Sequence, residues 1–171
     1  SITGFSSGPL SFMKMFDSVT EQIKLGGLRR GALMGVLRVD HPDIEEFITI
    51  KSQEEKALEN FNISVAITNK FMDAVKKNKD YFIINPRNDK KVGKDSASRI
   101  FSLMCEMAWK IGDPGVIFID RVNEDNPTPK LGSIESTDSC GEQPLLPYES
   151  ANLGSINLTN FTNNKKINYK K

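Results

Sequence analysis

The chain has 171 residues, of which 38% are hydrophobic and 26% charged, which is an ordinary globular composition with enough apolar side chains for a core. Its 23 basic and 22 acidic residues give a formal net charge of +1. A chain this close to neutral is not expected to bind nucleic acid through its net positive charge. No apolar run approaches the ~20 residues of a membrane helix, and the N-terminus lacks a signal-peptide pattern, so we expect no membrane partner. Because an initiator Met is also absent, we expect the chain to start inside a larger protein.

The chain holds few metal-binding or disulfide-forming residues. Two cysteines are too few for a disulfide scaffold, so we expect a cytoplasmic protein with reduced thiols. The chain also has only one histidine, and one histidine with two cysteines argues against a structural zinc site. We therefore expect no metal site in this chain.

The first part of the chain predicts a helix, a strand and a second helix. After a loop over residues 4–9, four apolar residues recur at helical spacing, and Gly26 and Gly27 are expected to end that helix. The four are Phe12, Phe16, Val19 and Ile23. Residues 32–39 predict a buried strand, and Pro42 and Asp43 favour the first turn of a following helix. Its expected inner face consists of Ile44, Phe47 and Ile48.

The middle of the chain continues the alternation of strands and helices. Large apolar residues stand at every second position from Phe61 through Ile63 and Val65 to Ile67, which predicts a strand. Thr68 is expected to cap the next helix. Residues 81–84 predict another strand, and Asp95 or Ser96 is expected to cap a longer helix. The inward residues of that helix are expected to be Ile100, Phe101, Met104, Ala108 and Ile111. A turn at 112–115 and an apolar strand at 116–119 follow, and together these elements predict an α/β fold with mostly parallel pairing.

The regular pattern stops between residues 123 and 148, where prolines and glycines predict a long loop of a length that is often functional. Cys140 lies in this loop among small and polar residues, with Glu142 two positions later. One interpretation is a reactive sulfur beside an acid or base that can move substrate protons. The other is an inert loop cysteine. Cys105, on the predicted long helix, is interpreted as core filler.

Several ordered blocks resemble the vitamin B12-dependent class of ribonucleotide reductases, and they run in order over nearly the whole chain. The blocks are residues 26–32 (GGLRRGA), 40–44 (DHPDI), 61–65 (FNISV), 108–109 (AW) with 112–115 (GDPG), 140–150 (CGEQPLLPYES) and 152–158 (NLGSINL). Iron-dependent relatives usually carry different residues around the cysteine, and they remain the nearest alternative class.

The resemblance implies part of a ten-stranded α/β barrel with a central finger loop. It divides the chain into an effector and dimer-helix segment (1–32), β/α units (33–122), the finger loop (123–148) and a following segment (149–171). Cys140 matches the thiyl-radical cysteine that removes the 3′ hydrogen of a ribonucleotide, and Glu142 matches the carboxylate that handles the 3′-hydroxyl proton. In an extended loop, residues 138, 140 and 142 would face one substrate, and a buried loop tip would protect the radical from water.

The resemblance also implies a regulatory site near the N-terminus. Gly26, Gly27, Arg29, Arg30 and Gly31 match the specificity loop that couples a bound dNTP or ATP effector to the choice of substrate. Glycines allow two backbone states there, and arginines can pair with phosphate; the alternative is a helix end followed by two surface arginines. The preceding helix resembles the dimer helix of a homodimer, and the alternative is a helix that packs in the core. Substrate binding is expected at Ser6 and Ser7.

The chain departs from this family at three positions of the loop region. Asp138 stands where the family has an asparagine that binds the ribose hydroxyls, and Ser139 where it has proline. An ionised Asp only accepts hydrogen bonds, and a second carboxylate near Glu142 is expected to raise one pKa by repulsion. Ala151 replaces a redox cysteine of the family, so that position lacks the thiol that would deliver reducing equivalents.

Two functions follow from the resemblance and its departures. The first is ribonucleotide reduction for deoxyribonucleotide synthesis, started by adenosylcobalamin and completed by a thiol protein such as thioredoxin, with no turnover by this piece alone. The second is a non-catalytic effector-binding module or a decayed paralogue, which Ala151 and Asp138 favour. An engineered trap or a variant that uses an outside reductant would show the same substitutions.

Overall fold

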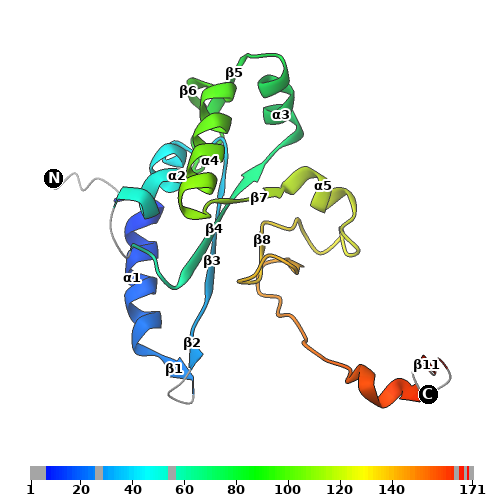
Figure 1. Ribbon diagram of the computed structural model, residues 1–171. Helices are drawn as coiled ribbons and strands as arrows, with labels where there is room; N and C mark the ends of the chain where they lie inside the picture. Colours follow the sequence, from blue (N-terminus) through cyan, green and yellow to red (C-terminus); the bar gives the residue numbers. More distant parts are fainter. Residues whose placement is uncertain (1–6, 26–28, 54–56, 164–165, 168, 170–171) are drawn as a thin grey trace.

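The computed structural model describes residues 7–25, 29–53, 57–163, 166–167 and 169, and is built around a three-stranded parallel sheet (Figure 1). The sheet has the order β3-β4-β7, with β3 at Leu33–Arg38, β4 at Phe61–Ile67 and β7 at Gly115–Phe118. Leu33 pairs with Phe61, and Ser64 pairs with Gly115, so β4 is the central strand. The predicted α/β fold with parallel central strands is confirmed.

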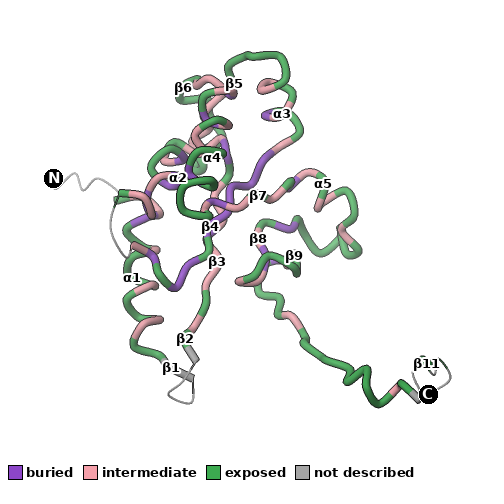
Figure 2. The backbone as a smooth tube through the Cα atoms, in the orientation of Figure 1, coloured by how far each residue is buried: buried purple, intermediate pink, exposed green. Residues whose placement is uncertain are grey.

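Helices cover one face of the sheet. They are α1 (Gly8–Gln22), α2 (Ile44–Gln53), α3 (Asn69–Lys76) and α4 (Ala97–Ile111). The alternate residues Phe61, Ile63, Val65 and Ile67 of β4 belong to the main buried cluster with the inner residues of these helices. Figure 2 shows this burial running along β4 and the helix faces turned toward it.

The finger-loop segment packs on the opposite face of the sheet. Ala66 of β4 forms a second buried cluster with Ile119, Ile134 and Leu146. Ile119 begins the short helix α5 (Ile119–Glu124). The loop that follows contains the antiparallel strands β8 (Ser136–Thr137) and β9 (Pro144–Leu145). β4 is therefore buried from both sides, because residues of opposite parity on one strand face opposite layers.

Smaller antiparallel pairs lie outside this sandwich. β1 (Lys24–Leu25) pairs with β2 (Arg29–Arg30), β5 (Asp80–Ile84) pairs with β6 (Lys91–Ser96), and β10 (Thr162–Asn163) pairs with β11 (Lys166–Ile167) after the 3₁₀ helix η1 (Leu158–Phe161). The segment that follows β9 leaves the sheet and extends away from it as far as η1 (Figure 1).

Several predicted details are confirmed. Ile44, Phe47 and Ile48 are buried on α2. Thr68 caps α3, because its Oγ1 accepts a hydrogen bond from the Phe71 amide at 3.1 Å, and Ser96 caps α4 in the same way through the Arg99 amide.

Other details were wrong for identifiable reasons. β6 was not predicted because its residues are mostly charged and exposed; it forms by pairing with β5, and Lys91 lies over the ring of Phe82. Ile119 starts a helix instead of ending a strand. Ala108 and Ile111 are exposed, since the buried stripe of α4 runs through Ile100, Met104 and Met107. The helix α1 ends at Gln22, and the glycines expected to end it lie outside the described residues.

Within the described residues the sheet does not close into the ten-stranded barrel that the resemblance implies. β3 and β7 are edge strands, each paired on one side only in this part of the chain. The structure thus contributes three parallel strands of the expected barrel. No helix in the described ranges is long and apolar enough to cross a bilayer.

The N-cap of α3 offers a test of this fold. Thr68→Ala removes the side-chain acceptor for the Phe71 amide, and we expect the free energy of unfolding to fall by about 1 kcal/mol in urea denaturation. Thr49→Ala is the matched control, because the Thr49 hydroxyl bonds only within α2, to the Glu45 and Glu46 carbonyls and from the Gln53 side chain, and caps no helix end. Equal stability changes in the two variants would contradict the capping role.

Candidate functional site

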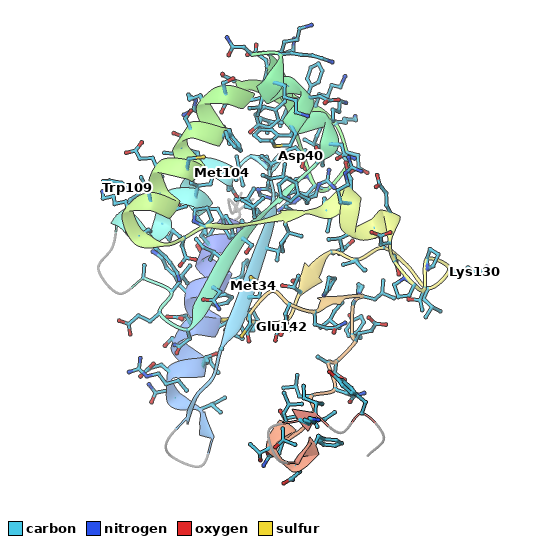
Figure 3. All side chains as sticks on the ribbon, turned by 45° about the vertical axis from the view of Figure 1, so that its right-hand side comes forward. Met34, Asp40, Met104, Trp109, Lys130 and Glu142 are labelled. Atoms are coloured by element: carbon cyan, nitrogen blue, oxygen red, sulfur yellow. The ribbon has the colours of Figure 1, made fainter. Side chains whose placement is uncertain are left out.

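Cys140 lies at the turn between β8 and β9, on the side of the sheet opposite the helices (Figure 3). The turn is closed by main-chain hydrogen bonds: the Gly141 amide donates to the Asp138 carbonyl at 3.1 Å, and the Asp138 amide donates to the Gln143 carbonyl at 3.0 Å. Gly141 has φ +84°, a left-handed conformation that a side chain would strain. The expected extended conformation of residues 138–142 is therefore wrong: the tip is a tight turn.

The carboxylate of Asp138 organises this turn. Its Oδ1 accepts the Gln143 amide at 3.0 Å. That main-chain hydrogen bond is the largest cause of a lowered pKa of Asp138, and the Glu142 side chain and the amides of Gly141 and Cys140 act in the same direction. The expected repulsion does not raise the pKa of Asp138. Instead, the carboxylate accepts hydrogen bonds from main-chain amides of the loop. The Oδ1 of an asparagine could fill the same role.

Cys140 and Glu142 are both exposed in the described chain. Ser139 Oγ lies 3.9 Å from Cys140 Sγ, and Figure 3 shows Glu142 at the tip of the same hairpin. The enclosed loop tip that we expected is not formed by these residues, because only the side of the turn that faces the sheet is covered. Cys105 is exposed as well, so its interpretation as core filler was wrong: it lies off the buried stripe of α4.

Two residues of the sheet hold the turn in place. Asn62 Nδ2 donates a hydrogen bond of 2.6 Å to the Ser139 carbonyl. A Cβ built on Gly141 would lie 3.9 Å from Met34 Cε, so the Met34 side chain of β3 lies beside the turn. Sequence reasoning missed Asn62. The available signal was a polar residue at the start of an otherwise apolar strand, on the face opposite the helix-facing alternation.

The predicted specificity loop is a small hairpin formed by β1 and β2, with Gly26 and Gly27 outside the described residues. The main chain of Arg29 pairs with that of Leu25. Arg30 lies 3.8 Å from a carboxylate oxygen of Glu21 and 3.6 Å from one of Glu59. These exposed ion pairs are weak, so the Arg30 guanidinium remains open to exchange for a phosphate.

Gly31 has a steric role that the prediction did not anticipate. A Cβ at this position would lie 2.6 Å from Thr20 Cγ2 on α1, and the stiff, β-branched Thr20 has little room to move. We had attributed the glycine to backbone freedom; the structure instead requires it for the close approach of the loop to α1.

Helix α1 presents its apolar stripe to solvent. The exposed stripe residues are Phe12 (56%), Met15 (51%), Phe16 (54%), Val19 (50%) and Ile23 (59%). The helix contacts the core through the opposite side, with Leu10 buried and Met13 packed against the main cluster. Of the two interpretations of this helix, the exposed stripe favours one that packs against another protein surface.

The remaining predicted positions lie apart from the turn. Ser6 is outside the described residues. Ser7 is exposed next to the first residue of α1 and borders a hollow with the carboxylates of Asp43 and Glu46, which do not attract a phosphate. Ala151 lies in the segment that leaves the hairpin after β9.

The pKa of Asp138 generates a prediction. Because this pKa is lower in the folded turn than the ordinary value of about 3.9, the ionised carboxylate stabilises the turn above the ordinary carboxyl range, and this stabilisation is lost as the pH falls through the depressed value. We expect the Gln143 amide resonance, in protein labelled at glutamine nitrogen, to titrate with a midpoint below that range.

Asp138→Asn should abolish that titration while preserving the resonance position typical of a hydrogen-bonded amide. Asp125→Asn, which removes another carboxylate from the same loop region, should leave it unchanged. A Gln143 titration that persists in Asp138→Asn would show that another group controls the turn.

Comparison with known proteins identifies the family. The family model for the ribonucleotide reductase barrel domain matches residues 1–171. The chain is 53% identical over 171 residues to a vitamin B12-dependent ribonucleoside-diphosphate reductase of Thermoplasma acidophilum, covering 99% of the chain and 22% of that relative. It is 45% identical over 166 residues to the protein of the same description from Mycobacterium tuberculosis, covering 97% of the chain and 24% of the relative.

A vitamin B12-dependent ribonucleotide reductase of Rhodopirellula baltica is 36% identical over 183 residues, covering 92% of the chain and 18% of the relative. The chain spans about a fifth of the length of these curated relatives. Its match to the family model extends from the first residue to the last, and the chain belongs to the ribonucleotide reductase family as part of the barrel domain.

Proposed function

We propose that this chain is the finger-loop part of an enzyme that reduces ribonucleoside diphosphates to deoxyribonucleotides, with Cys140 as the radical-bearing residue. The observation that supports it is the position of Cys140 at the tip of a hairpin that packs on the face of the parallel sheet opposite the helices. Relatives at 53% and 45% identity are named ribonucleoside-diphosphate reductases, which favours a diphosphate substrate. Parts of the whole protein beyond this segment would cover the exposed tip.

In the proposed reaction, a thiyl radical on Cys140 Sγ takes the hydrogen atom from C3′ of the ribose. The C3′–H bond breaks, an S–H bond forms, and the unpaired electron moves to the sugar. Glu142, at the same tip, receives the proton of the 3′-hydroxyl. The 2′-hydroxyl leaves as water with a proton from an external dithiol. The dithiol then gives a hydrogen atom to C2′ and an electron to the 3′-carbonyl as its disulfide forms, and Glu142 returns its proton to the 3′-oxygen. Finally the hydrogen atom returns from Cys140 to C3′, which restores the thiyl radical.

Replacement of the hydroxyl by hydrogen consumes two electrons, which a pair of thiols supplies as it becomes a disulfide. Residue 151 is alanine and contributes no thiol. The proposed cycle therefore depends on a dithiol outside this segment, such as a thioredoxin-like protein that reaches the site directly. Both cysteines of the described chain are free, as thiol chemistry in a reducing cytosol requires.

The initiating cofactor we propose for the whole protein is adenosylcobalamin, since the relatives are named vitamin B12-dependent. No contact of the described residues identifies a binding site for it, and we place the cofactor-binding residues outside this segment. The oxidation of Cys140 to a radical therefore relies on residues elsewhere in the enzyme.

We further propose that the β1–β2 hairpin contributes to an effector site for a dNTP or ATP, and that α1 pairs with a second copy of the protein. The loosely held guanidinium of Arg30 supports the first, and the exposed stripe of α1 supports the second. The two sites adjoin, because Gly31 contacts Thr20 of α1 directly.

The alternative function is a nucleotide-binding protein that keeps the effector site and has lost reduction. Ala151 is the observation that favours it. Such a protein would bind labelled dNTP and form no radical at Cys140.

Activity of the full-length protein separates these functions. With adenosylcobalamin, a ribonucleoside diphosphate and an excess of dithiol, we expect Ala151→Cys with Asp138→Asn to raise deoxynucleotide formation at least tenfold. Adding Cys140→Ser should reduce that rate by on the order of 10³-fold or more, because it removes the sulfur on which all later steps of the reaction depend.

Cys105→Ser is the matched control and should leave the rate unchanged, because Cys105 lies on the outer side of α4. Absence of any activity in the restored protein, with dNTP binding intact, would reject the reductase proposal in favour of the nucleotide-binding alternative.

Self-association tests the role of α1. Phe16→Glu places a charge in the centre of the exposed stripe, and we expect it to weaken dimerisation of the full-length protein by at least tenfold in Kd by analytical ultracentrifugation. Ser18→Glu adds the same charge about 200° around the helix from Phe16 and should have little effect. Equal weakening by both variants would point to a general charge effect and against the stripe.

A further inference from the structure

The β8–β9 hairpin follows β4 along its length. Ile134 and Leu146, on either side of the hairpin, share a buried cluster with Ala66 near the end of β4, whereas Ser139 at the tip contacts Asn62 near its start. Ala66 and Asn62 are four residues apart, about 13 Å at the rise of a strand. The five-residue stretch from Ile134 to Ser139 reaches about 17 Å at most. The chain between the two contacts is long enough to span this distance, so the contacts at its base are compatible with a tip at the level of Asn62.

The hydrogen bonds within the turn set its shape without fixing its place. The amides of Gly141 and Gln143 both bond to Asp138, and the Asp138 amide bonds to the Gln143 carbonyl, so every one of these bonds joins residues within the turn. They would survive a movement of the whole tip as a rigid body. Only a contact with a residue distant in sequence can locate the tip relative to the sheet.

Among the described residues, the side chain of Asn62 makes the hydrogen bond that joins the turn to the sheet. Its Nδ2 donates to the Ser139 carbonyl at 2.6 Å across 77 positions of sequence. The carbonyl of Ser139 and the amide of Cys140 belong to one planar peptide unit. Holding this oxygen therefore restrains the peptide unit that contains the Cys140 nitrogen. The Met34 side chain lies beside Gly141, on the other side of the cysteine.

The acceptor is a main-chain oxygen, so the bond is independent of the side chain at 139. A serine or a proline there presents the same carbonyl to Asn62. The donor, in contrast, depends on the side chain at 62: an aspartate of the same shape would place an acceptor opposite an acceptor.

We propose that Asn62 is a positioning residue for Cys140: its side-chain amide holds the Ser139–Cys140 peptide against β4 and so fixes where the sulfur meets the substrate. Its consequence for catalysis rests on the function proposed above. A displacement of the sulfur by about 1 Å would lower the rate of hydrogen transfer on the order of 10²-fold, because transfer needs close alignment of the reacting atoms. Substrate affinity would change little, because Asn62 binds the loop and not the nucleotide.

The test uses the full-length protein in the Ala151→Cys background, with Asn62→Asp and Asn62→Gln. Asn62→Asp keeps the shape and removes the donor, and Asn62→Gln restores an amide on a longer side chain. Asn126→Asp is the control, because Asn126 Nδ2 makes the same kind of bond to the Gly132 carbonyl at 3.0 Å in the same loop. The first readout is the alkylation rate of Cys140 by iodoacetamide, measured by mass spectrometry relative to Cys105, which reports on the overall fold. The second is kcat and KM for the ribonucleoside diphosphate.

We expect Asn62→Asp to change Cys140 alkylation several-fold relative to Cys105 and to lower kcat on the order of 10²-fold with KM unchanged. Asn62→Gln should lie nearer the parent in both readouts, and Asn126→Asp should match the parent. Unchanged Cys140 alkylation in Asn62→Asp would overturn the positioning role, as would an unchanged kcat in an active enzyme. If alkylation changes as expected while the parent and all variants lack reductase activity, the positioning role stands and the proposed function fails.

Discussion

The burial of β4 on both faces is the constraint on which the rest of the structure depends. Ile63, Val65 and Ile67 face the helices, while Ala66 lies in the cluster that holds the finger-loop segment. β4 accordingly lacks charged residues, and its one exposed side chain, that of Asn62, lies near its start. Because β4 packs against both layers, the helices that hold β4 in place also determine the surface on which the β8–β9 hairpin packs.

The helix-facing half of this arrangement was predictable because it rests on local rules. Apolar periodicity located α2 and β4, and the hydroxyls of Thr68 and Ser96 marked helix starts that the structure confirms. Hydrophobic patterns failed to predict elements that depend on a neighbour. The charged strand β6 forms because β5 lies beside it. Helix α5 begins inside an apolar run that would equally predict a strand. Neither a partner strand nor the place where a run bends is encoded in the periodicity of a single segment.

In the candidate site, too, residue identities were predictable from the sequence and their conformation was not. The sequence pointed to Cys140, Glu142 and Asp138 because their identities carry the family resemblance, and the structure brings these three together in one turn. What the sequence could not indicate was the conformation: an extended loop was expected, whereas Gly141 and the Asp138 carboxylate form a tight turn. The contact between Asn62 and Ser139 was also hidden, since it joins residues 77 positions apart and depends on how two elements pack.

Three surfaces of this segment remain uncovered, and they share one physical reason. The tip with Cys140, the stripe along α1 and the unpaired edges of β3 and β7 are each complete on the side that faces the described core and open on the other. The chain spans about a fifth of its relatives' length. In the reaction proposed above the open tip matters most, because a thiyl radical needs a site from which water is excluded. In that proposal the described segment would set the position of the sulfur, and residues outside it would supply the enclosure.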